Sequence, residues 1–288
     1  MKAKQLNGAL AKIRKICPVT LPCFNRRFLR IGILPILKLC LVHGLVMLGE
    51  ANMGKTPVAL ALCFLMSRYY IIAFNLDQDP QMRQASDLDF FRGDPGSIFQ
   101  PFLLDDSNLA MQAIEKLKAF LDVSEEEAMT YQRWGASKFV RNQFRVANAN
   151  AYDEGVERDL PIMYPTDEFD NIAKDKFYNL IEPALMKNTS KPDVDALLKR
   201  ATFIVVSKNF IYVKRAAQEE VIRFRNVEQN LLTDEGGLRY YQWKTNGTMP
   251  DASLLRAEID VEQRMMARLV MGRPAEPPRW QRGSLNPN

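Results

Sequence analysis

Residues 49–56 read Gly-Glu-Ala-Asn-Met-Gly-Lys-Thr, which fits the pattern G-x-x-x-x-G-K-[ST] of a phosphate-binding loop. An apolar run precedes this segment, and a helix-like run follows it. Glycines let such a loop curl so that backbone N–H groups point at phosphate oxygens, and the helix N-terminus favours negative charge. Lys55 would reach the β- and γ-phosphates, and Thr56 would offer a hydroxyl to Mg²⁺. We therefore expect nucleotide contacts from Gly49, Asn52, Gly54, Lys55 and Thr56.

Two residues in and after the loop predict weak nucleotide binding. Pro57 has no N–H to offer an α-phosphate, although proline is tolerated in the first turn of a helix. Met53 places a bulky side chain where such loops often carry a small one.

Paired carboxylates follow a short apolar strand, 102–104, as Asp105 and Asp106. The C-terminal tip of a parallel strand lies at the sheet edge where ligands bind. There Asp105 would hold Mg²⁺ and Asp106 would polarise the attacking water. Asp77 and Asp79, after an apolar run that follows the loop's helix, are the competing pair. We prefer Asp105 and Asp106 because they are contiguous and directly end a strand.

A third polar cluster, Ser207-Lys208-Asn209, ends the expected strand 203–206. The amide of Asn209 could hydrogen-bond the attacking water or the γ-phosphate; the alternative is a plain hairpin turn. Lys214 and Arg215 follow closely. Arg215 is our candidate for a finger that neutralises transition-state charge on a neighbouring subunit's nucleotide. Both could instead be solvated charges at a strand end.

The composition of the 288 residues, 47% hydrophobic and 25% charged, is that of a globular protein. The net charge of +5 is compatible with nucleic acid. A single histidine, His43, argues against histidine-based catalysis. The four cysteines lack zinc-ligand spacing, so we expect free thiols in an intracellular, reducing compartment, the nucleus among them. They are Cys17, Cys23, Cys40 and Cys63.

The first 49 residues contain no Asp or Glu and many basic residues. This predicts an organelle transit segment, a nucleic-acid-binding arm or a solvated helix face, and the sequence leaves all three open. The most apolar stretch, 31–48, is interrupted by Pro35, Lys38 and His43, so we expect no membrane span and no membrane partner.

The order of expected elements predicts an α/β protein with a mainly parallel sheet flanked by helices. A strand–loop–helix–strand unit begins the core. The expected strands are 45–48, 70–74, 102–104, 203–206 and 210–213. The expected helices are 58–70, 108–133 with a second start at 124, 136–153, 177–186, 193–200 and 254–271.

Three elements in this order resemble the superfamily 3 helicases, AAA+-like ATPases of small viruses and mobile elements. The loop 49–56 resembles their Walker A motif, 102–106 their Walker B strand, and 203–209 their motif C with its sensor asparagine; Arg215 falls where an arginine finger would be sought. The resemblance implies an ASCE-type P-loop NTPase fold, Mg²⁺-dependent hydrolysis of ATP, a homo-oligomeric ring and nucleic-acid translocation. With one histidine, the His-x-His nicking motif is absent.

We therefore expect four parts: a basic N-terminal extension (1–41), a P-loop ATPase core (42–215) with a helical insertion at 110–190, a mixed C-terminal region (216–271) and a disordered tail (272–288). The leading hypothesis is ATP hydrolysis coupled to nucleic-acid unwinding or translocation. The alternatives are an AAA+ ATPase that remodels protein, a degenerate module that binds nucleotide or nucleic acid without turnover, and a small-molecule kinase with Arg141 and Arg145 in its lid.

Overall fold

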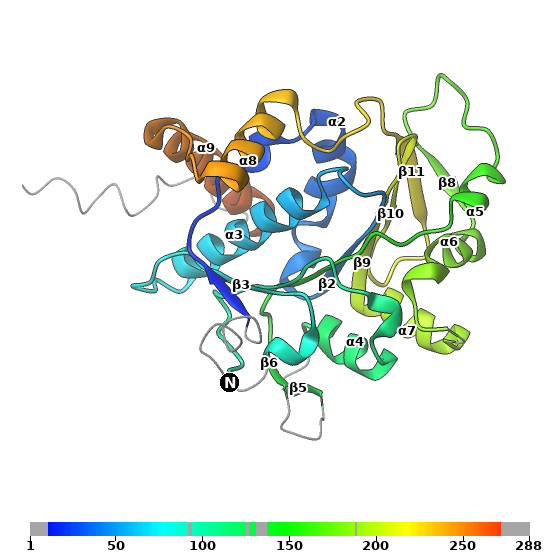
Figure 1. Cartoon of the computed structure of the whole chain (residues 1–288), viewed down its shortest axis with the longest axis horizontal. Coiled ribbons are helices and arrows are strands. Elements are labelled where there is room, and N and C mark those ends of the chain that lie inside the picture. Colours follow the sequence, from blue (N-terminus) through cyan, green and yellow to red (C-terminus); the bar gives the residue numbers. More distant parts are fainter. Residues whose placement is uncertain (1–10, 92–93, 125–126, 131–136, 188, 272–288) are drawn as a thin grey trace, which may run out of the picture.

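One mixed sheet crosses the middle of the molecule, and helices cover both of its faces (Figure 1). The structure is a computed structural model that describes residues 11–91, 94–124, 127–130, 137–187 and 189–271. The tail from residue 272, which we expect to be disordered, lies outside these residues. The described chain is thus a mixed α/β protein with three layers.

Within the described residues, the strands of the main sheet are β1 (Lys12–Arg14), β2 (Gly44–Gly49), β3 (Met82–Ala85), β4 (Phe102–Leu104), β7 (Arg145–Asn148), β8 (Asp170–Ile172), β9 (Ala201–Val206), β10 (Phe210–Lys214) and β11 (Val221–Arg225). A separate antiparallel pair is β5 (Glu127–Thr130) with β6 (Ser137–Val140). The α-helices are α2 (Arg26–Phe28), α3 (Lys55–Ala73), α4 (Ile114–Leu121), α5 (Glu154–Arg158), α6 (Lys174–Ile181), α7 (Lys191–Arg200), α8 (Asp234–Asn246) and α9 (Ala252–Met266).

The strand order is β1-β3-β4-β7-β2-β9-β10-β11-β8. The central strands β3, β4, β7, β2 and β9 pair in parallel. β1 at one edge and β10, β11 and β8 at the other pair antiparallel. Our prediction of a mainly parallel sheet is therefore wrong. The connections from β9 to β10 and from β10 to β11 are too short for the crossover that a parallel pair requires.

The two faces of β2 belong to two hydrophobic clusters. Leu45 and Met47 pack in the cluster that contains α3, whereas Val46 and Leu48 pack in the cluster that contains α4, α6 and α7. A central parallel strand is covered on both faces, and it therefore reads as a continuous apolar run.

Helix α3 is longer than expected, and the predicted strand at 70–74 is wrong. Most of that apolar run continues the helix to Ala73, and the next strand starts only at Met82. By length and composition α3 could cross a membrane, contrary to our expectation for the sequence, but 72% of its most apolar window is buried inside the fold. A helix that is apolar all round is expected in a protein core as well.

The predicted helix at 136–153 is also wrong, because this stretch contains β6 and the core strand β7. The misleading residue is Arg145, which is fully buried rather than solvated. Its guanidinium donates to carbonyl oxygens of α4, of β6 and of the turns beside them: Ala119, Phe120, Val140, Asp122 and Gln143. Burial lowers the pKa of Arg145 to about 9. A buried arginine cannot serve in a kinase lid.

The expected helix at 108–133 is only partly present. Helix α4 covers Ile114–Leu121, and the stretch from Glu127 to Thr130 forms β5. The predicted strands at 203–206 and 210–213 are confirmed as parts of β9 and β10.

Residues 11–41, expected as a basic extension, pack into the core cluster around α3. β1 of this segment adds to the sheet beside β3. All four cysteines are free, as predicted, and the structure shows that all four are also buried. Burial raises the pKa of the Cys17 and Cys40 thiols to about 12, so both are protonated at neutral pH.

Candidate functional site

The loop between β2 and α3 turns sharply at two glycines. Gly49 has a φ of 119° and Gly54 a φ of 89°, values in the left-handed region that favour glycine. Gly49 also lies against β9, since a Cβ there would be 1.9 Å from the carbonyl oxygen of Val206. The N–H of Glu50 donates to that same oxygen at 2.9 Å. The loop thus begins where strand pairing leaves no room for a side chain.

Lys55 is the first residue of α3 and is only 6% exposed. Its ammonium donates to the carbonyl oxygen of Gly49 at 2.9 Å and to that of Glu50. Burial lowers the pKa of Lys55 to about 8, although the charges of Asp106 and Asp105 act in the opposite direction. We would expect a loop lysine to face solvent, and this is wrong here because the loop carbonyls hold the ammonium.

Asp105 follows β4 and gathers three hydrogen bonds. Its Oδ1 accepts from the hydroxyl of Thr56 at 2.9 Å and from Nδ2 of Asn148 at 3.1 Å. Its Oδ2 accepts from Nε2 of Gln84 at 2.6 Å. Burial raises the pKa of Asp105, and the bonds from Asn148 and Thr56 counteract this shift. The loop hydroxyl and the strand-end carboxylate therefore meet, although their residues lie far apart in the sequence.

Asp106 is exposed, with a φ of 50°, and it lines the same cavity as Lys55 and Thr56. Asp77 and Asp79 lie exposed in the connection between α3 and β3. No strand ends at this second pair, because α3 continues through most of the residues expected to form one. The structure thus brings Asp105 and Asp106 to the loop and leaves Asp77 and Asp79 outside the cavity.

Thr56 and Asp105 supply a hydroxyl and a carboxylate in contact, which are the hard oxygen donors that Mg²⁺ takes. Among the residues that the structure describes, no group of three or more His, Cys, Asp or Glu side chains could hold a metal alone. Mg²⁺ usually keeps water and binds through one or two carboxylates together with phosphate oxygens. These residues fit Mg²⁺ shared with a phosphate-bearing ligand.

A cavity of about 340 Å³ opens beside the loop. Its walls come from the loop, from the turn after β4, from the end of β7 and from α8. The residues beyond the loop and Pro57 are Asp106, Asn148, Asn150, Leu232, Tyr240, Tyr241 and Lys244. Our reading of the sequence missed Asn148, although it follows the apolar pair 146–147 much as Asp105 follows β4. β7 pairs with both β2 and β4, so its end falls between the loop and Asp105.

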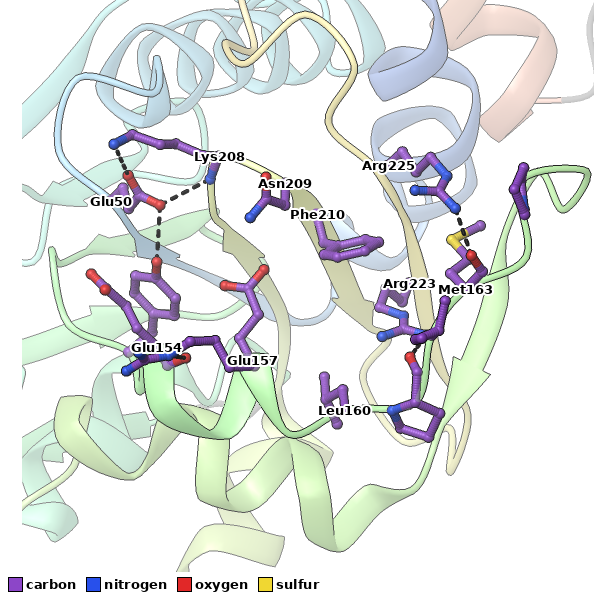
Figure 2. A pocket seen from close by; sticks show the side chains of 15 residues that line it. Glu50, Glu154, Glu157, Leu160, Met163, Lys208, Asn209, Phe210, Arg223 and Arg225 are labelled. Carbon is purple, nitrogen blue, oxygen red and sulfur yellow. Dashed lines mark hydrogen bonds and ion pairs between the residues drawn. The ribbon is translucent and has the colours of Figure 1, made fainter.

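Asn209 lies in the tight turn between β9 and β10. The N–H of Ser207 donates to the carbonyl of Phe210 at 2.9 Å, and the N–H of Asn209 donates to the Ser207 hydroxyl at 3.2 Å. β9 is a parallel neighbour of β2, as predicted. However, Asn209 lines a second cavity of about 590 Å³ and not the cavity of Lys55 (Figure 2). Residues 207–209 therefore form the hairpin turn that was the alternative prediction. Asn148, and not Asn209, lines the cavity of Lys55.

Arg215 lies at the opposite edge of the sheet from the loop. β10 runs antiparallel to β9, so Lys214 pairs with Phe203 while Ile211 pairs with Val206 beside the loop. Arg215 follows Lys214 along the chain, so it lies still further from the loop at 49–56. Within one chain, the structure does not bring Arg215 to the cavity of Lys55.

Glu50 connects the loop with the second cavity (Figure 2). Its Oε1 accepts from the hydroxyl of Tyr152 at 3.0 Å and from the N–H of Lys208 at 2.9 Å. Beside it, Glu157 accepts from the hydroxyl of Ser207 at 2.6 Å, and burial raises the pKa of Glu157. Glu50 is the second residue of the loop, a position at which the motif accepts any residue. Its hydrogen bond from Lys208 connects the loop with the turn between β9 and β10.

No protein-family model and no curated protein matches this chain. The geometry of the loop, of Asp105 and of the cavity walls is therefore the basis for assigning a function.

Gly49→Ala is expected to lower the free energy of unfolding by more than about 2 kcal/mol, because its Cβ would collide with the backbone of Val206. Gly237→Ala in α8 is the matched control. Its Cβ meets nothing within 4 Å, so it should raise stability by about 0.5–1 kcal/mol. Urea unfolding of both variants measures the difference. Equal stabilities would contradict the close approach at Gly49.

Proposed function

We propose that this protein binds ATP with Mg²⁺ and hydrolyses it. The observation that carries the proposal is the hydrogen bond of 2.9 Å between the Thr56 hydroxyl and Asp105. A loop with the phosphate-binding pattern and an acid from a distant strand meet at one point, as a shared Mg²⁺ site requires. When bound, Mg²⁺ would neutralise charge on the phosphate oxygens.

The strand order supports a P-loop NTPase fold for the core. β2, the loop and α3 lead by a crossover to β3, and β7 lies between the loop strand β2 and the acidic strand β4. β7 thus separates the strand of the loop from the strand that precedes the paired acids. Because β7 ends beside both motifs, its last residues are in position to act on the same ligand.

Asn148 is the best candidate for the sensor role that the sequence suggested for Asn209. It is 1% exposed, its Nδ2 donates to Asp105, and its Oδ1 has no hydrogen-bond partner among the described residues. A buried acceptor without a partner is costly unless a ligand or water meets it. In our proposal this oxygen receives a hydrogen bond from the attacking water, and Asp106 polarises that water.

A module that binds nucleotide without turnover is the second candidate. Pro57 stands in the first turn of α3, where it removes one N–H from the helix start. The loop carbonyls compete with phosphate for the ammonium of Lys55. Both features lower the affinity that the motif would otherwise supply, and turnover measurements separate the two candidates.

Lys55→Ala should weaken binding of Mg-ATP by at least about tenfold, because a charge-assisted hydrogen bond to phosphate is lost. Titration with ATP measures this effect. Lys199→Ala, an exposed lysine of α7, is the control and should bind like the parent. Since Lys55 is buried, thermal unfolding must first show that the variant is folded. Unchanged affinity in folded protein would remove the loop assignment.

Asp106→Asn should slow hydrolysis by about 100-fold or more while sparing ATP affinity, as expected when an interaction acts mainly in the transition state. Asp77→Asn is the control, because Asp77 is exposed in a connection outside the cavity. Single-turnover hydrolysis and ATP titration give the two quantities. The reverse pattern, with Asp77→Asn inactive and Asp106→Asn active, would show that the wrong acids were chosen.

Coupling of ATP hydrolysis to nucleic acid, in a homo-oligomeric ring, is the further part of this proposal. Two observations support it: the resemblance of three sequence motifs to those of superfamily 3 helicases, and the net charge of +5. Single-stranded DNA or RNA should raise the rate of hydrolysis at least about threefold at low salt, and this stimulation should fade as salt rises. Poly-glutamate, an anionic polymer without bases, is the control. Stimulation by unfolded protein instead of nucleic acid would favour the remodelling alternative.

A further inference from the structure

Helix α8 lines one side of the cavity beside the loop at 49–56. The connection that leads into α8 contacts the loop directly: the N–H of Leu231 donates to the carbonyl of Met53 at 3.0 Å, and Nδ2 of Asn230 donates to the carbonyl of Asn52 at 3.2 Å. Tyr240, Tyr241 and Lys244 of α8 then line the cavity. Residues at i, i+1 and i+4 share one side of a helix, so one face of α8 is turned towards the cavity.

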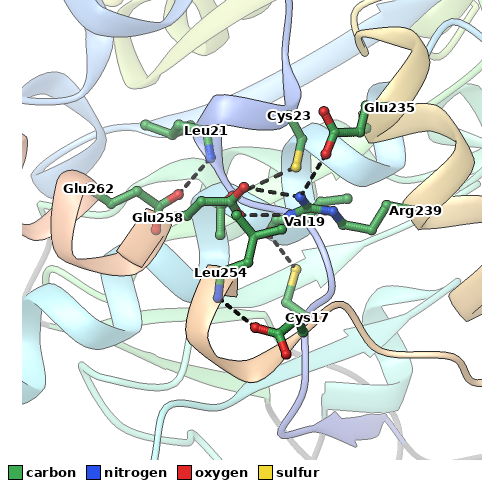
Figure 3. A network of polar contacts seen from close by, with 12 residues as sticks. Cys17, Val19, Leu21, Cys23, Glu235, Arg239, Leu254, Glu258 and Glu262 are labelled. Atoms are coloured by element: carbon green, nitrogen blue, oxygen red, sulfur yellow. Dashed lines mark hydrogen bonds and ion pairs between the residues drawn. The ribbon is translucent and has the colours of Figure 1, made fainter. Parts of the chain in front are cut away.

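A polar network holds α8 in this position (Figure 3). Arg239 donates to both oxygens of Glu258 in α9, at 2.7 and 3.0 Å, and Glu258 also accepts from Thr20 at 2.6 Å. One turn further along α9, Glu262 forms a buried ion pair with Arg68 of α3. Because α3 is the helix that starts at the phosphate loop, α8 is braced against the element that carries Lys55.

Two cationic side chains line the cavity among the described residues. Lys55 and Lys244 are the basic residues that line it, and Lys55 is already engaged by the loop carbonyls. Asp105 and Asp106 add negative charge beside the position of a terminal phosphate. Arg215 lies at the opposite edge of the sheet and supplies no charge within the chain.

Lys244 is exposed and has no hydrogen bond or ion pair with another residue in the described part of the chain. Its ammonium sits on a flexible four-carbon stem, which suits a phosphate binder that acts as a point charge. Tyr240 and Tyr241 of the same helix also line the cavity, so Lys244 stands beside two aromatic side chains there.

We propose that Lys244 binds the terminal phosphate of the nucleotide and neutralises its charge within the same chain. The inference rests on the proposed binding of ATP and assigns part of that site to α8. An ion pair with the terminal phosphate is available in Mg-ATP and missing in Mg-ADP. Lys244 should therefore discriminate between the two nucleotides, whereas a purely structural role would change both affinities equally.

The test compares the affinities of the full chain for Mg-ATP and Mg-ADP by calorimetric titration. Lys244→Ala and Lys244→Gln should weaken Mg-ATP binding by about tenfold and Mg-ADP binding by less than about twofold, since one charge-assisted contact is removed. Lys244→Arg should keep Mg-ATP affinity within about threefold of the parent, because the charge remains. Lys176→Ala, an exposed lysine of α6, is the charge-matched control and should change neither affinity.

Equal weakening of both nucleotides, or no weakening of either, would overturn the assignment of Lys244 while leaving ATP binding intact. Failure of Lys244→Arg to recover affinity would also overturn it, because charge would then not be the cause. If the parent chain binds neither nucleotide, the proposed function fails together with this inference. Lys55→Ala separates failure of the Lys244 assignment from failure of the proposed function. If the parent binds Mg-ATP and folded Lys55→Ala does not, the nucleotide binds at the loop, whatever the result for Lys244.

Discussion

The parallel pairing of β2 with β9 brings the two backbones so close at Gly49 that no side chain fits between them. The chain must leave the sheet at this point, and Gly54 then turns it into α3. This path aims the start of α3, with Lys55 and Thr56, at the same sheet edge where β4 ends in Asp105. The positions of Lys55 and Thr56 therefore depend on one backbone approach in the centre of the sheet.

Two buried polar residues of β7, Arg145 and Asn148, differ in how far their hydrogen bonds are satisfied. Arg145 in β7 is fully buried and donates its hydrogen bonds to carbonyl groups of β6, α4 and the adjoining turns. Removing such a group from water is costly, and these bonds offset that cost only while all the segments stay in place. Arg145 thus ties the start of β7 to α4 and β6. In contrast, Oδ1 of Asn148, three residues later, has no hydrogen-bond partner within the part of the chain that the structure describes.

Particular elements show which patterns could be read from the sequence. The turn between β2 and α3, the strands β9 and β10 and the free thiols are correctly predicted because glycine spacing, β-branched runs and cysteine spacing act locally. The strand at 70–74 is wrong because a short apolar run fits a buried helix as well as a strand. The helix at 136–153 is wrong because Arg145 resembles a solvated residue until its carbonyl partners, most of them distant in sequence, are known.

The sequence by itself determined the turn at 49–54 and the start of α3, since eight neighbouring residues specify both, and the same pattern predicts phosphate binding. Only the tertiary structure decided what surrounds it. Whether Asn148 or Asn209 lies beside Asp105 depends on strand order, which follows from crossovers between distant segments. The position of Lys244 depends on the packing of α8 and α9 against α3. Helices pack where each buries its apolar face against the apolar face of another element. A local sequence pattern predicts that a helix has such a face, but it does not predict which element will cover it.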